Sequence, residues 1–156
     1  LTVLPDVHTK EQRRRNMSAI KGKNTKPEQL IRKALYREGF RYRLHYSRLP
    51  GKPDLVFPKY KAIVLINGCF WHRHGCHLFK WPSTNQTFWI EKLNKNALRD
   101  LKNLQLYRQE GWKTLTIWEC CLRGPGKIQI EELIEAVGAW IVSGEADRAL
   151  SGSLIN

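Results

Sequence analysis

The stretch Pro53-Asp-Leu-Val-Phe57, followed after a short turn by Ala62-Ile-Val-Leu-Ile-Asn67, decides the fold of this 156-residue chain. Residues 54–57 predict a short strand that is entered through a Leu49-Pro-Gly-Lys-Pro53 turn. Residues 62–66 form a continuous apolar run of strand length, which predicts a fully buried strand. Two adjacent strands of this kind place the centre of a sheet in the middle of the chain.

Helices are predicted on both sides of these strands. Thr25-Lys-Pro-Glu28 has the spacing of a capping box and opens a helix over 25–38, in which Leu30, Ala34 and Leu35 are expected to face inward. Residues 40–46 alternate between apolar and polar, as in a half-exposed strand. A long helix over 87–110, a strand over 112–119 and a helix over 131–142 follow. The expected class is α/β, a three-layer-like mixed sheet flanked by helices.

Three segments are expected along the chain. Residues 1–24 contain a basic helix, opened by the capping-box spacing of Thr9 and Gln12, and a linker, and we expect them to form a DNA-contacting arm. Residues 25–143 form the main domain. Residues 144–156 are expected to be a loosely ordered tail.

Charge points to a polyanionic partner. The chain has 27 Lys and Arg against 14 Asp and Glu, a net charge of +13. Fourteen basic but only three acidic residues lie between Lys10 and Lys52, and nucleic acid is the commonest partner of such a patch. No apolar run approaches the roughly 18 residues of a membrane span. With no secretory signal pattern at the start, a cytoplasmic, non-membrane protein is expected.

Cysteine and histidine spacing indicates a metal site. Cys69, His74 and Cys76 lie in one loop, and Cys120 follows a predicted strand, a set that suits a closed tetrahedral structural zinc site. His72 and His77 are rival ligands in the same loop. Cys121 rivals Cys120 for the fourth position. Two buried free thiols with incidental histidines are the alternative interpretation.

A second set of residues suits phosphodiester hydrolysis. Hydrolysis needs a divalent metal on hard oxygen ligands and a group that activates water. Asp54 enters a strand that is followed by a second strand, as in nucleases of the PD-(D/E)xK type, yet Ile66-Asn67-Gly68 lacks the acid and lysine of that motif. Glu28 is a candidate second carboxylate, although capping alone explains it. His72 is a candidate general base, with Asp100 to orient it.

Large aromatic residues suit contact with bases. Phe70 and Trp71 lie inside the proposed zinc loop. Trp89, Lys92, Asn96 and Asp100 share one helix face, offset from the expected core residues Leu93, Ala97, Leu101 and Leu104. Met17, in the basic arm, is a candidate wedge for the minor groove or a residue that docks its helix.

Together these residues resemble the very-short-patch repair endonucleases, bacterial enzymes that act on T·G mismatches left by deamination of 5-methylcytosine. The resemblance runs from about Asp6 to Trp140. It rests on Leu49-Pro-Gly-Lys-Pro-Asp54, Asn67-Gly-Cys-Phe-Trp-His72 with His74-Gly-Cys76, Phe88-Trp-Ile-Glu-Lys92, Trp118-Glu-Cys120 and Asn16-Met-Ser-Ala-Ile20.

The resemblance implies a restriction-endonuclease-like core and a role for each candidate residue. It places Mg²⁺ on Asp54 and the main-chain carbonyl of Ile66, Glu28 beside the metal-bound waters, and His72 with Asp100 at the attacking water. Zinc falls on Cys69, His74, Cys76 and Cys120. The DNA contacts are Phe70, Trp71 and Trp89 as intercalating residues, Met17 in the minor groove, and Lys92 and Asn96 near the mismatched pair.

The implied reaction is a nick 5′ to the thymine of the T·G pair, made by a monomer, with a mismatch-repair protein as a candidate partner. Asn67 departs from the family pattern, which has a histidine near the scissile phosphate. Its amide donates a hydrogen bond but cannot shuttle a proton. The alternatives are a nuclease of the same fold for other mismatches or branched DNA, and a zinc-containing DNA-binding module without activity.

Overall fold

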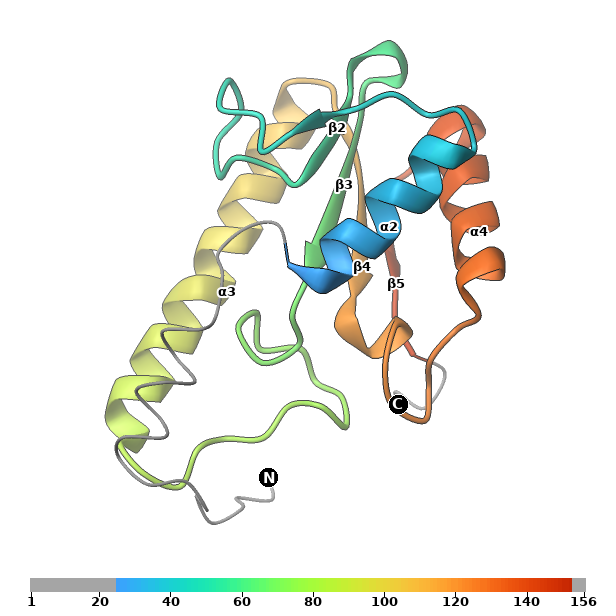
Figure 1. The fold of residues 1–156 in the computed structure, drawn as a ribbon. Helices are drawn as coiled ribbons and strands as arrows, with labels where there is room; N and C mark the ends of the chain where they lie inside the picture. Colours follow the sequence, from blue (N-terminus) through green and yellow to red (C-terminus); the bar gives the residue numbers. More distant parts are fainter. Residues whose placement is uncertain (1–24, 153–156) are drawn as a thin grey trace.

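The computed structural model describes residues 25–152, in which one mixed sheet has the strand order β1-β2-β3-β4-β5 (Figure 1). The strands are β1 (Arg43–Leu44), β2 (Leu55–Phe57), β3 (Ala62–Asn67), β4 (Lys113–Trp118) and β5 (Arg148–Leu150). β1, β2 and β3 pair antiparallel, whereas β3, β4 and β5 pair parallel. The predicted hydrophobic strands β2 and β3 are therefore neighbours near the middle of the sheet.

Helices cover both faces of this sheet, as the α/β prediction requires. Helices α2 (Lys26–Arg37) and α4 (Ile130–Ser143) pack on one face, and α3 (Gln86–Gln109) lies on the other (Figure 1). Alternate residues of each strand point to opposite faces. Leu55, Phe57 and Val64 accordingly join the core under α2 and α4, while Val56 and Ile63 pack with Tyr107 of α3. No helix within the described residues has the length and apolar character of a membrane span.

The strand expected over 40–46 is shorter than predicted. Phe40 and Tyr42 make edge-on contacts with Phe57, with ring centroids 6.2 Å and 6.0 Å away, so the apolar side of the segment packs as expected. Only Arg43–Leu44 pairs with β2, however. His45 has a φ of 45°, in the left-handed region, and this conformation ends the strand.

Two expected core positions are wrong. Leu30 is 45% exposed, and Ile31, which is fully buried, takes its place in α2. In α3, Leu93 is buried but Leu101 is 60% exposed, while Tyr107 is buried instead. With 3.6 residues per turn, Leu101 lies about 60–120° around the helix from Leu93, Leu104 and Tyr107, so it falls outside the face that packs inward.

The segment after Ser143 is not loose as far as residue 152. It contains β5, which pairs parallel with β4 from Arg148↔Leu115 to Leu150↔Ile117. Asp147 fixes the approach to β5, because its carboxylate accepts hydrogen bonds from the Thr114 amide (2.9 Å) and the Arg108 guanidinium (2.8 Å). The sequence of this segment has little apolar alternation, so the prediction missed a strand that side-chain and backbone hydrogen bonds hold.

The carboxylate of Asp147 should stabilise the fold in a pH-dependent way. Burial raises its pKa, but the hydrogen bonds from Arg108 and Thr114 outweigh burial and leave the pKa below its usual range. A depressed pKa stabilises the folded state above the unfolded-state pKa of about 3.9, and this stabilisation is lost as the pH falls further. We expect Asp147→Ala to lower the free energy of unfolding by about 1–2 kcal/mol at pH 7.

Urea denaturation of the two proteins at several pH values checks this expectation. The difference between parent and Asp147→Ala should shrink below about pH 4. Glu135→Ala, an exposed substitution on α4, is the control and should change stability by less than about 0.5 kcal/mol. An equal loss of stability in both variants would contradict the role of Asp147.

Candidate active site and metal centre

Asp54 lies where β2 and β3 separate. The last register pair of these strands on this side is Leu55↔Val64, so no strand lies opposite Ile66 on the β2 side. The Asp54 carboxylate takes that place and accepts a hydrogen bond of 2.8 Å from the Ile66 amide. Because the N–H and C=O of a residue in an extended strand point to the same edge, the Ile66 carbonyl is directed toward the side of the sheet on which Asp54 lies.

Burial makes this carboxyl group unusual. It raises the pKa of Asp54 to about 6, against the lowering effect of the Ile66 hydrogen bond, and the nearby Glu28 adds a further upward contribution. A carboxylate with few water contacts and a second carboxylate beside it favours a bound cation. The fork of the sheet therefore offers hard oxygen ligands in the kind of place where a divalent metal binds.

Glu28 and His45 form a pair next to Asp54. Glu28 is in the first turn of α2 and is almost fully buried, and the Thr25 side chain caps this helix by accepting from the Glu28 amide (3.4 Å). Glu28 Oε2 lies 3.0 Å from His45 Nε2. The donor atoms of Glu28, His45 and Asp54 are all within 4.8 Å of one another.

His72 and Asp100 form a second pair. His72 is in the loop after β3, and its Nδ1 lies 2.5 Å from Oδ2 of Asp100 on α3. Because an ionised carboxylate can only accept hydrogen bonds, Nδ1 of the neutral ring carries the proton and donates to Asp100. Nε2 is then the unprotonated nitrogen and can act as an acceptor. Asn67, the last residue of β3, is half-buried and lies between Asp54 and His72 in the sequence. All three residues line one open groove.

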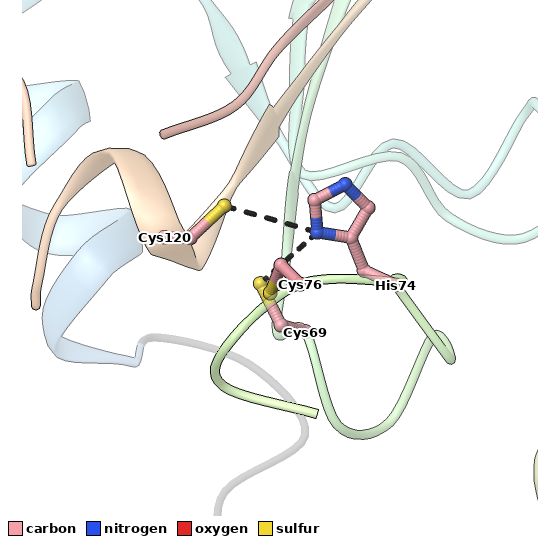
Figure 2. Close-up of side chains that lie close together, drawn as sticks. All are labelled: Cys69, His74, Cys76 and Cys120. Atoms are coloured by element: carbon pink, nitrogen blue, oxygen red, sulfur yellow. Dashed lines mark hydrogen bonds between the residues drawn. The ribbon is translucent and has the colours of Figure 1, made fainter. Parts of the chain in front are cut away.

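Cys69, His74, Cys76 and Cys120 gather in a separate cluster, with their ligand atoms within 4.8 Å of one another (Figure 2). His74 Nδ1 lies 3.5 Å from Cys69 Sγ and 3.8 Å from Cys120 Sγ. Tetrahedral zinc, with Zn–S bonds of about 2.3 Å and Zn–N bonds of about 2.0–2.1 Å, separates these ligand atoms by about 3.6 Å. The composition of the cluster and these two distances suit a tetrahedral metal site.

The rival ligands lie elsewhere. Cys121 is buried in the hydrophobic core beneath α2 and α4, although it is the neighbour of Cys120 in a short 3₁₀ turn (Glu119–Cys121). His72 is paired with Asp100. Among the described residues, His77 has both ring nitrogens buried without a hydrogen-bond partner. Its ring packs so closely on Gly124 that a Cβ atom at that position would lie 2.5 Å from Nε2. The structure thus groups the four favoured residues and none of their rivals.

The surroundings of the cluster hold it in shape. The His74 ring stacks on Trp118 with centroids 4.1 Å apart and an interplanar angle of 7°. The Gly152 amide donates to Cys120 Sγ at 3.2 Å, so the segment after β5 supports a ligand. Burial raises the pKa of the Cys69 and Cys120 thiols, and a bound cation would be needed to hold them as thiolates at neutral pH.

Three large aromatic side chains stand beside the two sites. The ring centroids of Phe70 and Trp71 are 5.3 Å apart, and Trp89 lies 5.4 Å and 5.8 Å from them. The Asn96 amide donates to the Trp71 carbonyl (3.1 Å) and so fixes the loop to α3. Lys92 is exposed on the same helix. Met17 falls outside the described residues.

A broad open groove has Asp54, Phe70, Trp71, His72 and His74 among the residues that line it. Its volume is about 2250 Å³, more than twice that of ordinary small-molecule pockets, which reach about 1,000 Å³. Glu28, Asp54 and Asp100 line it together with a set of basic residues: Lys26, Lys52, Arg73, Lys92, Arg99 and Arg123. An open groove with basic walls and carboxylates suits a large anionic substrate that is processed at a metal.

Comparison with known proteins places this site in a family. The sequence profile described as DNA mismatch endonuclease Vsr matches residues 5–78. The DNA mismatch endonuclease Vsr of Escherichia coli (strain K12) is 41% identical over 138 residues, which are 88% of this chain and 88% of that protein. The chain belongs to the Vsr family. It is also 45% identical to the type II nicking enzyme V.NmeAIP of Neisseria meningitidis, over 77% of this chain and 86% of the relative.

A third Vsr-family relative is the type II nicking enzyme V.HpaIIP of Haemophilus parainfluenzae, 38% identical over 81% of this chain and 92% of its own. Within this Vsr-family chain, sequence reasoning missed His45, the groove residue that pairs with Glu28. His45 was interpreted as part of the polar side of a strand, among arginines. The sequence did carry a signal at this position: residue 45 has an imidazole, whereas the neighbouring polar positions, Arg41 and Arg43, have guanidinium groups.

Proposed function

We propose that this chain is a Mg²⁺-dependent endonuclease that nicks one strand of duplex DNA 5′ to the thymine of a T·G mismatch, and so begins very-short-patch repair of deaminated 5-methylcytosine. One observation carries the proposal: the buried Asp54 at the fork of the sheet shares a basic groove with the His72–Asp100 pair. The relatives named as mismatch endonuclease and nicking enzymes support the reaction class.

Asp54 and the Ile66 carbonyl would hold the Mg²⁺ ion. Bound there, Mg²⁺ would stabilise negative charge on the phosphate and lower the pKa of a bound water. Glu28, beside Asp54, would orient the waters of the ion by accepting their hydrogen bonds. Asn67 would donate a hydrogen bond to a phosphate oxygen, a role that needs no proton transfer.

His72 would act as the general base. Asp100 holds Nδ1 and keeps the proton there, so Nε2 accepts a proton from the attacking water. The water oxygen bonds to phosphorus, the bond from phosphorus to the 3′-oxygen breaks, and the 3′-oxygen takes a proton from solvent, so the products are a 3′-hydroxyl and a 5′-phosphate. Phe70, Trp71 and Trp89 would insert beside the mismatched pair, with Lys92 and Asn96 near it and Met17 in the minor groove. One chain supplies all these groups, so we propose that it acts as a monomer.

Replacing Asp54 should abolish nicking without abolishing DNA binding. Asp54→Asn keeps the shape and the acceptor for the Ile66 amide but removes the metal-binding charge. We expect the nicking rate on a T·G duplex to fall by about 10³-fold or more, on the scale of one lost electrostatic contribution to the transition state. A single-turnover assay on matched T·G and T·A duplexes, with a gel-shift assay of binding, measures both effects.

The same assay tests specificity. The parent protein should nick the T·G duplex far faster than the T·A duplex. Equal rates on the two duplexes would refute the mismatch specificity, and full activity of Asp54→Asn would refute the metal site. No nicking of any duplex by the parent would favour a DNA-binding module without activity.

His72 and Asp100 should behave as one unit. His72→Ala removes the base and should lower the nicking rate by about 10²–10⁴-fold. Asp100→Asn leaves the ring but no longer fixes its proton, so its effect should be smaller. Because the two residues act together, the double variant should be scarcely slower than His72→Ala alone. Multiplying effects in single-turnover rates would show that the two residues act independently.

We propose further that the Cys69, His74, Cys76 and Cys120 cluster binds one structural Zn²⁺. All four positions of a tetrahedral site are filled by protein, so the ion would stabilise the loop and take no part in hydrolysis. The adjacent cysteines provide a matched pair of variants. Cys120→Ser should lose most of the zinc, whereas Cys121→Ser should keep about one zinc per chain because Cys121 lies in the core.

Metal analysis of the purified proteins, together with thermal unfolding, checks this prediction. Addition of a zinc chelator should lower the melting temperature of the parent and of Cys121→Ser, but should have little effect on that of Cys120→Ser. A zinc content well below one ion per chain in the parent, or equal zinc contents in Cys120→Ser and Cys121→Ser, would contradict the assignment.

A further inference from the structure

Glu28, His45 and Asp54 bring three potential metal ligands to one point of the groove. They come from three different segments: the first turn of α2, the residue after β1 and the residue before β2. Their ligand atoms lie within 4.8 Å of one another. The group is separate from the Cys69–Cys120 cluster, and its nitrogen ligand was not among the residues expected from the sequence.

The backbone directs His45 toward this point. Its φ of 45° lies in the left-handed region, which is unfavourable for an L-residue. Its amide donates to the Asp54 carbonyl (3.2 Å), and the next amide, of Tyr46, donates to the Pro53 carbonyl (3.3 Å). These two bonds tie the segment of His45 to that of Asp54. Strained backbone of this kind persists where surrounding structure fixes it, and it often marks a functional site.

The charges and the spacing of the group both suit a divalent cation. The buried Glu28 and the half-buried Asp54 place two carboxyl groups side by side, an arrangement that a cation between them would stabilise. Glu28 Oε2 and His45 Nε2 are 3.0 Å apart. Adjacent ligands in an octahedral shell with bonds of about 2.1 Å are also about 3.0 Å apart. An ion at this point would replace the Glu28–His45 hydrogen bond with a bond to each of the two side chains.

We propose that Glu28, His45 and Asp54 together form a mixed oxygen and nitrogen metal site, in which the His45 imidazole makes Mn²⁺ bind more tightly than Mg²⁺. Imidazole is a ligand for transition metals, whereas Mg²⁺ strongly prefers oxygen. The inference rests on the proposed function and deepens it, since Asp54 binds the ion in both. Mg²⁺ would meet Glu28 through a bound water, whereas Mn²⁺, held by His45, would also bind the Glu28 carboxylate directly. It names the class of ion that this catalytic site selects.

Mn²⁺ itself is the probe, used with the full chain loaded with one Zn²⁺ per chain, which the Cys/His cluster takes up, and freed of excess Zn²⁺. Loss of the signal of free Mn²⁺ in electron paramagnetic resonance measures binding, and added Mg²⁺ measures competition. We expect one Mn²⁺ per chain, bound at least about ten-fold more tightly than Mg²⁺. Electron spin echo modulation should show a ¹⁴N coupling from a directly bound imidazole.

His45→Gln keeps a hydrogen-bonding side chain but removes the imidazole. It should weaken Mn²⁺ binding about ten-fold or more, change Mg²⁺ binding by less than about three-fold, and abolish the ¹⁴N coupling. His45→Asn, which tolerates left-handed backbone, is a second variant with the same expected result. Ser47→Ala, in the same groove, is the control and should leave Mn²⁺ binding and the coupling unchanged. Circular dichroism and zinc content verify the fold of each variant.

Unchanged Mn²⁺ affinity in both folded His45 variants, or a ¹⁴N coupling that persists in them, would overturn the proposal. The outcome is separable from that of the nicking assay, because binding is measured without DNA. A chain that binds Mn²⁺ through His45 but nicks no duplex would contradict only the proposed function. A chain that nicks T·G duplexes while its His45 variants keep full Mn²⁺ affinity would contradict only this inference.

Discussion

The hydrogen bond from the Ile66 amide to the Asp54 carboxylate is the interaction around which the active groove is organised. Where β2 and β3 separate, an amide of the central strand would lack a partner, and an unsatisfied buried amide costs about 1–3 kcal/mol. Asp54 provides the acceptor by side chain instead of by backbone. The same bond fixes the carboxylate at the opening between the strands, so a requirement of the sheet also positions a metal ligand.

The loop that follows β3 depends on a different constraint. Residues 68–82 contain no regular helix or strand apart from turns and an isolated bridge, yet they carry His72, Phe70 and Trp71. The Cys/His cluster joins this loop to the end of β4, and Asp100 and Asn96 join it to α3. Contacts to the segment after β4 on one side and to α3 on the other explain how residues without secondary structure can hold a base in one orientation. A metal in the cluster would act on catalysis only through that orientation.

How far the sequence predicts these features depends on the kind of interaction. Hydrophobic periodicity predicted β2, β3 and the three described helices, because burial follows a local pattern. Cysteine spacing predicted the cluster, but it favoured Cys120 over Cys121 only weakly, since the 3₁₀ turn after β4 breaks the alternation that would distinguish them. β5 was missed because its support comes from Asp147 and from pairing with a strand over 30 residues away. His45 was missed because a left-handed residue, which no local pattern announced, redirects its side chain.

The distribution of charge in the groove imposes an order on substrate binding. Lys52, Lys92 and Arg99 attract a phosphate backbone at long range, whereas Glu28, Asp54 and Asp100 repel it at short range. Attraction at the walls suffices for association, and it weakens with salt. Close approach of one phosphate to the carboxylates becomes favourable only when a divalent cation offsets their charge. Duplex binding should therefore need little metal, while the productive position of the scissile phosphate should need the ion, which separates capture of DNA from its hydrolysis.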